Sequence, residues 1–310
     1  MKSSRRDGNR IQMSVLILAA LAVGCGRQPW PSPPAVEQAK YEVDHRAWRE
    51  TQRGLLSDVL SIVGVWPLRD GDTAFGSEMS LPIVLPLSGE PTRAGVFRRE
   101  GKTISIIPAP GSALRFPDGR PVSNAIPLNG DVWIGSLLIY VADAGDDRRW
   151  VTARDMKHPA ITSPPVLDAF PPDARWRVSA RFDAFESPKP VEVPDVRGGS
   201  MSFLSLGQLV FQLDGQEHRL TAFGEPGGGE FFVMFKDSTN QTSTYGYRIL
   251  TPAVVNSGQW TVIDFNFAFN PPCAYSRFTL CPLPPPENTL PVAIEAGLKR
   301  LPSAQGYSPS

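Results

Sequence analysis

The sequence predicts an α+β fold, mainly β, in which antiparallel β-sheets or barrel-like subdomains follow one N-terminal helix. Proline and glycine contribute 32 and 27 of the 310 residues and are spread along the chain. That composition favours many short strands with tight turns over long helices. Runs of β-branched and aromatic residues recur between turn signals, as is typical of strands. One stretch near the N-terminus has helical spacing instead.

The expected helix extends from residue 35 to about residue 57, a stretch without proline. Residues suited to one buried face recur there at alternating spacings of three and four: Tyr41, His45, Trp48, Gln52, Leu55 and Val59. This spacing places them on one side of a helix, against a core. The charged residues between them are expected to face solvent.

Short strands are expected in both halves of the chain. In the first half they cover residues 83–87, 95–99, 103–107 and 132–142. In the second half they cover residues 175–182, 208–213, 231–235, 246–250 and 260–265, with a hairpin turn at 213–217. A faint similarity between the halves suggests two β subdomains that meet near residue 165, although chance similarity among short hairpins explains it equally well.

The first 25 residues have the features of an export signal. A positively charged start precedes an apolar run at residues 13–23, which is too short to span a bilayer and suits a signal-peptide core. Residues 21–25, LAVGC, resemble a bacterial lipobox, in which Cys25 would receive diacylglycerol. An ordinary secretory signal with a chance cysteine is the alternative. The mature chain is expected to be exported and anchored to a membrane through lipid on Cys25.

The predicted organisation has four parts: a signal peptide at 1–24, a tether at 25–35, a single domain at 36–302 and a flexible tail at 303–310. The tether is rich in proline and therefore extended and semi-rigid. Gly26 replaces the aspartate that usually retains lipoproteins in the inner membrane. In a Gram-negative host, the periplasmic side of the outer membrane is therefore the predicted location.

Charge argues against nucleic acid as a partner. The chain has 31 basic and 31 acidic residues, and the first 24 residues hold four basic and one acidic of these, so 27 and 30 remain. No basic stripe of the kind that follows phosphates is present. The sequence also lacks a nucleophile elbow, a dinucleotide loop, a Walker loop and a zinc-protease motif. No cofactor and no metal are predicted, and the catalytic residues remain unknown.

Two cysteines, Cys273 and Cys281, lie eight residues apart between prolines. In an exported chain a disulfide between them would close a small loop and contribute about 2–3 kcal/mol. Reduced thiols are the alternative, and a zinc site would need a distant histidine as well.

The same region carries a resemblance to a known family. Residues 264–288 read DFNFAFNPPCAYSRFTLCPLPPPEN and residues 296–299 read AGLK, with FKDST at 235–239 and TYG at 244–246 upstream. These motifs resemble domain-of-unknown-function family 1684, and a weaker resemblance extends over residues 42–300. The family implies no activity. Tyr247, Phe267 and Leu298 depart from its pattern, where glycine, arginine and glutamate are usual, which suggests an altered ligand or a degraded site.

The predicted function is the binding of a small polar or anionic ligand beside this stiff, proline-rich loop. Arg248 would be the charged contact, and the candidate residues are Tyr245, Arg248, Asp264, Asn266, Asn270, Glu287 and Asn288. One alternative is a hydrolase that uses Asp264 or Glu287 as general base. The other is a structural or partner-binding protein, in which an Asp237–Arg248 pair and the asparagines brace the loop.

Overall fold

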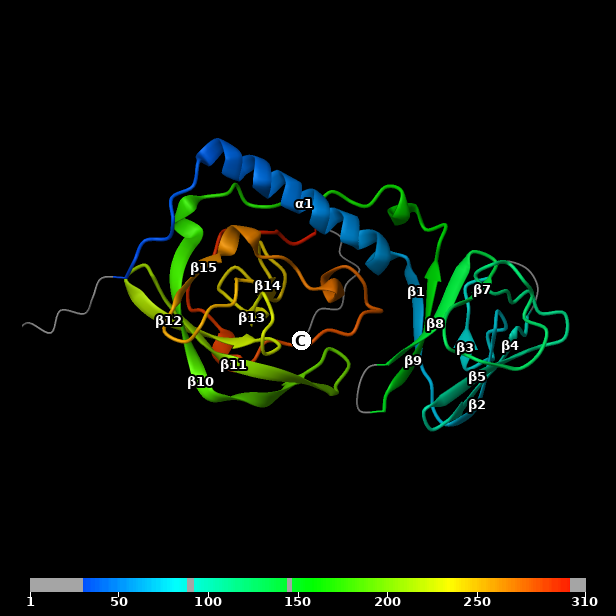
Figure 1. The fold of residues 1–310 in the computed structure, drawn as a ribbon. Coiled ribbons are helices and arrows are strands. Elements are labelled where there is room, and N and C mark those ends of the chain that lie inside the picture. Colours follow the sequence, from blue (N-terminus) through cyan, green and yellow to red (C-terminus); the bar gives the residue numbers. More distant parts are fainter. Residues whose placement is uncertain (1–29, 88–91, 144–146, 302–310) are drawn as a thin grey trace, which may run out of the picture. The chain divides into compact units, whose positions relative to one another are not determined.

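The computed structural model describes residues 30–87, 92–143 and 147–301 (Figure 1). The chain from Ser32 onward forms one compact unit. The expected signal peptide, residues 25–29 of the tether with Cys25, and the expected tail lie outside the described residues, so these assignments stay predictions. Among the described residues, no helix is both long and apolar enough to cross a membrane.

The predicted fold class is confirmed. One α-helix, α1 (Gln38–Leu60), precedes a series of mostly antiparallel strands in the described part of the chain. The first half holds a sheet with the order β1 (Ile62–Pro67), β9 (Arg149–Asp155), β8 (Leu137–Asp143) and β7 (Val132–Ile134). A second sheet has the order β3 (Ile83–Val84), β2 (Gly71–Gly76), β4 (Gly95–Glu100), β5 (Thr103–Pro108) and β6 (Ile126–Pro127).

These two sheets share one apolar core. Phe75, Phe97 and Ile106 from the second sheet belong to the same buried cluster as Ile139 and Val151 from the first. The rings of Phe75 and Phe97 lie 4.5 Å apart. In β5, β7, β8 and β9 alternate residues belong to this cluster, as the strand period of two requires.

The predicted strand at 132–142 is wrong in one respect, because it is a hairpin of β7 and β8. The buried residues are Val132 and Ile134, then Leu137 and Ile139, so the alternation changes phase between the two pairs. Gly135, at φ +60°, supplies the left-handed turn that the phase change requires. In this half, strands β1, β2, β6 and β9 were not predicted.

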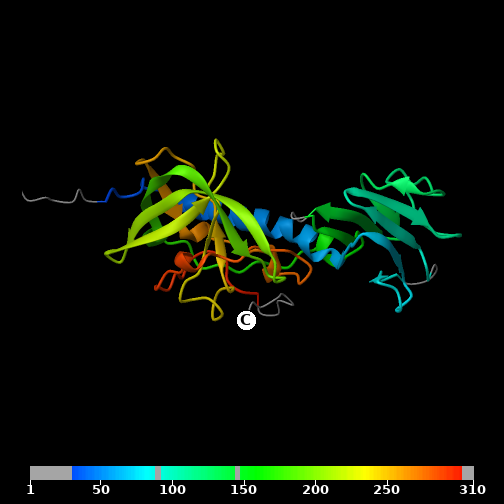
Figure 2. The same ribbon diagram turned by 90° about the horizontal axis from the view of Figure 1, so that it is seen from below.

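The second half is built around a sheet that curls into a half-barrel (Figure 2). Its order is β12 (Gln216–Phe223), β11 (Ser200–Leu213), β10 (Arg177–Pro194) and β15 (Trp260–Asp264). The predicted turn between β11 and β12 is confirmed, with Asp214 and Gly215 both at positive φ. A two-stranded sheet of β13 (Val233–Phe235) and β14 (Arg248–Leu250) completes this half.

The segment after β15 has short 3-10 turns in place of strands: η3 (Phe265–Phe267), η4 (Pro272–Ala274) and η5 (Pro286–Asn288). Two buried clusters lie in this half. One contains the curled sheet and Phe235 and Phe265, and the other contains Leu56 of α1 together with Cys273 and Cys281. The proline-rich loop is therefore a packed part of the second half.

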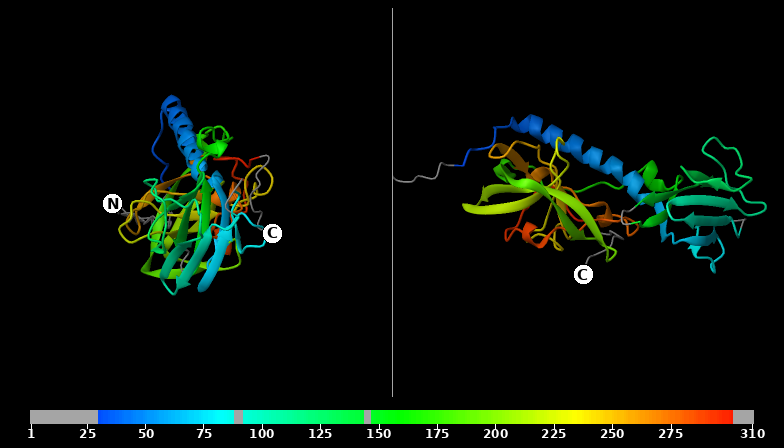
Figure 3. Two further views of the ribbon diagram at one scale, coloured as in Figure 1. Left: turned by 90° about the vertical axis from the view of Figure 1, so that its right-hand side faces the viewer. Right: turned by 60° about the horizontal axis from the view of Figure 1, so that its bottom comes forward.

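Helix α1 contacts η3. The blue ribbon in Figure 3 continues from the end of α1 into β1. Tyr41 and His45 are buried, as predicted. Near the end of the helix the prediction is wrong by one residue, since Leu55 is 55% exposed and Leu56 is 2% exposed. At about 100° per residue, position 56 returns closer to the direction of His45 than position 55 does.

Candidate ligand-binding site

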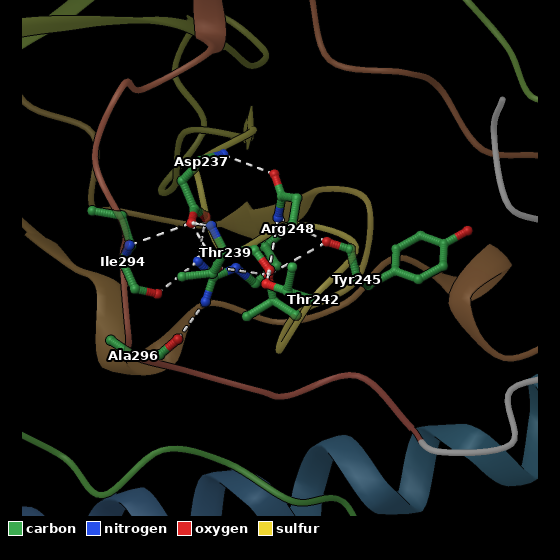
Figure 4. A network of polar contacts seen from close by, with 9 residues as sticks. Asp237, Thr239, Thr242, Tyr245, Arg248, Ile294 and Ala296 are labelled. Atoms are coloured by element: carbon green, nitrogen blue, oxygen red, sulfur yellow. Dashed lines mark hydrogen bonds and ion pairs between the residues drawn. The ribbon is translucent and has the colours of Figure 1, made fainter.

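Arg248 lies at the start of β14 and is fully buried (Figure 4). Its guanidinium donates to the carboxylate of Asp237 and to the carbonyls of Ala296 and Ile294. Burial lowers the pKa of Arg248, and the Asp237 carboxylate opposes that shift. The Asp237–Arg248 pair expected under the structural alternative is thus present.

Asp237 joins this pair to the turn that follows it. Its carboxylate accepts from the backbone N–H of Thr239 at 2.8 Å and from the Thr239 hydroxyl at 2.6 Å. The backbone N–H of Ile294 approaches the same oxygen at 3.3 Å. The network therefore fastens residues 294–296, near the C-terminus, to the turn after β13.

Asp264 and Asn266 belong to a different network, which holds α1 against the second half. Both carboxylate oxygens of Asp264 accept from the Tyr41 hydroxyl at 2.8 Å, and one accepts from Arg177 Nε at 3.0 Å. Burial and the nearby Asp264 carboxylate raise the pKa of Tyr41. The Asn266 carbonyl lies 3.0 Å from His45 Nε2. The cation beside Asp264 is Arg177, so the carboxylate and the arginine of the hydrolase hypothesis belong to separate networks.

The other asparagine candidates also bond within the protein. Asn270 Nδ2 donates to the Tyr275 hydroxyl at 3.2 Å and to the Lys299 carbonyl at 3.0 Å. Asn288 accepts from the backbone N–H of Thr221 at 2.7 Å and donates to two backbone carbonyls. Buried amides with such partners brace the segments they connect.

The remaining two candidates differ in exposure. Glu287 is exposed and lies 3.4 Å from the Thr221 hydroxyl. Tyr245 is buried, and its hydroxyl donates to the Cys273 carbonyl at 3.3 Å. The structure therefore brings Asp264 together with Asn266 and places Arg248 elsewhere. Ligand contact by any of these seven residues stays a prediction.

A pocket of about 700 Å³ lies beside the proline-rich loop. Four stretches of chain line it: Val59, Ile62 and Val65; Tyr140, Ala142, Asp143, Trp150 and Thr152; Arg197, Ser200, Met201 and Ser202; and Pro272, Phe278, Thr279 and Leu280. Most of the lining side chains are apolar. The volume is within the usual range of small-molecule sites, roughly 300–1,000 Å³.

An ion pair between Arg148 and Asp195 fixes the turn between β10 and β11, which borders this pocket. Arg148 donates to the Asp195 carboxylate at 2.9 Å and to the Ser200 carbonyl at 2.8 Å. Burial raises the pKa of Asp195, but the hydrogen bonds from Arg148 and two backbone N–H groups outweigh it and keep the pKa below its ordinary value. The Arg197 guanidinium lies 5.1 Å from the centre of the Trp150 ring.

Cys273 and Cys281 are both thiols and both buried in the structure. The backbone N–H of Cys273 donates to Cys281 Sγ at 3.2 Å. The disulfide stays a prediction. Among the described residues, no group of three or more histidine, cysteine or acidic side chains is placed to hold a metal ion.

The pocket residues were not predicted, apart from the loop that borders the pocket. Trp150, Arg197 and Met201 come from segments far apart in the sequence, and no motif joins them. The turn sequence PDVRGG at 194–199 is the one local signal that could have marked Arg197, because it combines turn residues with a cation.

Residues 165–299 match the family model described as "Protein of unknown function (DUF1684)". The chain belongs to this family. Among solved structures, it is similar to the solution NMR structure of an uncharacterized protein of Haloarcula marismortui, with 33% identity. That alignment covers 44% of this chain and 76% of the other, with a TM-score of 0.38. No curated protein matches the sequence.

Proposed function

We propose that this protein binds a small, mainly apolar molecule with one anionic group in the pocket beside the proline-rich loop. The observation that carries the proposal is the pocket's lining: a mainly apolar cavity of about 700 Å³ with one cation, Arg197, and one carboxylate, Asp143, which is already paired with Arg149. Lipid anchoring through Cys25 would place this site at a membrane surface, where amphiphilic molecules are abundant.

The apolar side chains supply affinity. Val65, Met201 and Leu280 come from three different stretches of the wall, so an apolar ligand would be covered from several sides. Burial of about 150 Å² of ligand apolar surface contributes roughly 4 kcal/mol before the entropic cost of binding. A wholly polar ligand would gain little from these walls.

Arg197 supplies the preference for an anion. Burial of part of the side chain lowers its pKa, while the residue as a whole is exposed and its guanidinium donates to the Arg277 carbonyl at 3.2 Å. An anionic group would accept charge-assisted hydrogen bonds from the guanidinium. Ser200, Ser202 and Thr279 line the same pocket, but the hydroxyls of Ser200 and Thr279 already donate to Glu192 and to the Ser276 carbonyl, so Arg197 carries the anion preference. The proposed ligand thus has an anionic group, as the sequence predicted. Its contacts are different residues, and it has a larger apolar part.

The test uses two fluorescent probes, the anionic 1-anilinonaphthalene-8-sulfonate and the uncharged N-phenyl-1-naphthylamine. Ala142→Trp, which fills the pocket, is expected to weaken the binding of both probes about tenfold or more. Arg197→Gln is expected to weaken only the sulfonate, by about tenfold, since a charge-assisted hydrogen bond is lost.

Arg219→Gln is the matched control, because this exposed arginine pairs with Glu217 on the β11–β12 hairpin and is not among the pocket's lining residues. Circular dichroism confirms that each variant is folded. The proposal fails if neither probe binds the parent protein. It also fails if the folded Ala142→Trp variant binds both probes as tightly as the parent.

A further inference from the structure

The two buried cysteines enclose the stretch of loop that forms one wall of the pocket. Phe278, Thr279 and Leu280 lie between them in the sequence, and Pro272 immediately precedes Cys273. Cys281 Sγ lies 3.9 Å from the hydroxyl of Thr279, which is itself a lining residue. A change in the position of Cys281 Sγ would therefore affect Thr279, a residue of the pocket wall.

The thiol groups are already in contact. Cys281 Sγ accepts from the backbone N–H of Cys273 at 3.2 Å. The hydroxyl oxygens of Tyr245 and Tyr247 lie 3.8 Å and 3.7 Å from Cys273 Sγ. Both cysteines are almost fully buried, at 0% and 2% exposure. Two thiols and two hydroxyls thus form one polar group inside an otherwise apolar cluster.

The two thiols differ in acidity. A hydrogen bond from the Cys281 thiol is the main cause that lowers the pKa of Cys273, and the tyrosine hydroxyls add to it against the effect of burial. The same hydrogen bond, together with burial, raises the pKa of Cys281. Because the thiolate is the nucleophile in disulfide chemistry, the lower pKa favours Cys273 as the attacking thiol and Cys281 as the resolving thiol.

We propose that Cys273 and Cys281 are a redox-active pair whose oxidation to a disulfide changes the wall of the pocket and weakens ligand binding. This inference rests on the proposed function, since it assigns regulation to the same site. The structure shows the dithiol with an open pocket of about 700 Å³, so the dithiol is the binding-competent state.

The oxidant is a low-molecular-weight disulfide, R–S–S–R. Because Cys273 is fully buried, the loop must first open locally. The Cys273 thiolate then attacks one of the sulfurs of R–S–S–R, forms a mixed disulfide and releases one thiolate RS⁻. Cys281 then gives up its proton and attacks the Cys273 sulfur, which forms the internal disulfide and releases the second RS⁻. The two protein thiols are oxidised, one disulfide is reduced to two thiols, and their two protons are taken up by the released thiolates.

Bond formation must move the loop. A disulfide holds its sulfurs about 2 Å apart, which is shorter than any non-bonded contact between them. Cys281 Sγ also leaves its positions at the Cys273 N–H and the Thr279 hydroxyl. Thr279 and Leu280 follow Cys281, and the pocket loses the shape that it has in the dithiol state.

The experiment uses the full chain with Cys25→Ser, so that only the pair reacts. The protein is treated with bis(2-hydroxyethyl) disulfide, and mass spectrometry follows the loss of two hydrogen atoms. Binding of 1-anilinonaphthalene-8-sulfonate is then measured in both redox states. We expect the oxidised protein to bind it about fivefold more weakly or worse.

Single variants identify the roles of the two thiols. Cys281→Ser is expected to stop at a mixed disulfide on Cys273, whereas Cys273→Ser is expected to leave Cys281 unmodified over the same time. Cys273→Ser is expected to show no redox-dependent change in probe affinity, since neither a mixed nor an internal disulfide forms. If the folded protein forms no internal disulfide while the chain in denaturant does, the redox pair is refuted.

Failure of the coupling and failure of the proposed function give different results. Equal probe affinity in the two redox states overturns the coupling and leaves the pocket standing. Probe binding in neither state overturns the proposed function. Hydrogen exchange at residues 196–202 and 278–280 then tests the coupling without a ligand, and unchanged exchange between the two states refutes it.

Discussion

Arg248 shows how a side chain that looks functional can be structural. An arginine near a conspicuous motif suggested an anion contact, yet its guanidinium is fully buried and donates to Asp237 and two carbonyls. Desolvation of a buried ion pair costs nearly as much as the attraction returns. Removal of one partner is much more costly, since it leaves the other charge buried and unpaired.

We therefore expect Arg248→Ala to lower the free energy of unfolding by about 3–5 kcal/mol, measured by urea denaturation. The double variant Arg248→Met with Asp237→Leu is expected to recover part of that loss, because no charge remains buried. Arg219→Gln, which breaks an exposed pair, serves as the control and is expected to cost less than about 1 kcal/mol. A loss below about 1 kcal/mol in Arg248→Ala would contradict the bracing role.

The strong bend of the curled sheet depends on a close backbone contact. The register of β10 and β11 shifts between Ala184 and Lys189, opposite Gly207. A Cβ atom on Gly207 would lie only 2.4 Å from the carbonyl oxygen of Asp183. The two strands can approach this closely only because residue 207 has no side chain.

Gly207→Ala is expected to cost about 2 kcal/mol or more, since the backbone of β10 must move away from the new methyl group. The melting temperature measured by circular dichroism provides the test. Gly229→Ala is the matched control, because a methyl group at that position would meet no other atom within 4 Å. Equal melting temperatures for the two variants would show that the close contact does not set the bend.

At the scale of the whole molecule, α1 connects the two halves, and its attachment is sensitive to pH. His45 is buried against the Asn266 carbonyl, and burial lowers the pKa of this imidazole. The unfolded chain therefore binds a proton at higher pH than the folded chain does, with a pKa near 6.5. Stability from this group is fully present above about pH 6.5 and is lost as the pH falls toward the lower folded pKa.

The pH-dependent part of this stability is expected to disappear in His45→Gln. Glutamine can still donate to the Asn266 carbonyl but does not titrate. Urea denaturation between pH 7.5 and pH 5 is expected to show a smaller decline in stability for the variant than for the parent protein. Parallel declines would assign the pH dependence to other groups.

The fold was largely predictable from local patterns, and the site was not. Turn residues and alternation predicted the β11–β12 hairpin, while the phase change at Gly135 shows where the same reasoning missed a turn. A helix has 3.6 residues per turn, and spacings of three and four residues only approximate this value. The error accumulates along α1, so the buried position near its end is Leu56 and not the predicted Leu55. The pocket is lined by four stretches that only the tertiary fold brings together, so no local sequence pattern could predict it.

The lining of the pocket is divided between the family segment and the part of the chain that precedes it. Residues 165–299 contribute the wall from Arg197 to Ser202 and from Pro272 to Leu280, while Val59 to Thr152 complete the enclosure. A family segment without this preceding part would present Met201, Phe278 and Leu280 to water, at the edge of an open face. The preceding half therefore covers this wall of the pocket, so substitutions in it would change the ligand preference of the proposed site while leaving the family segment intact.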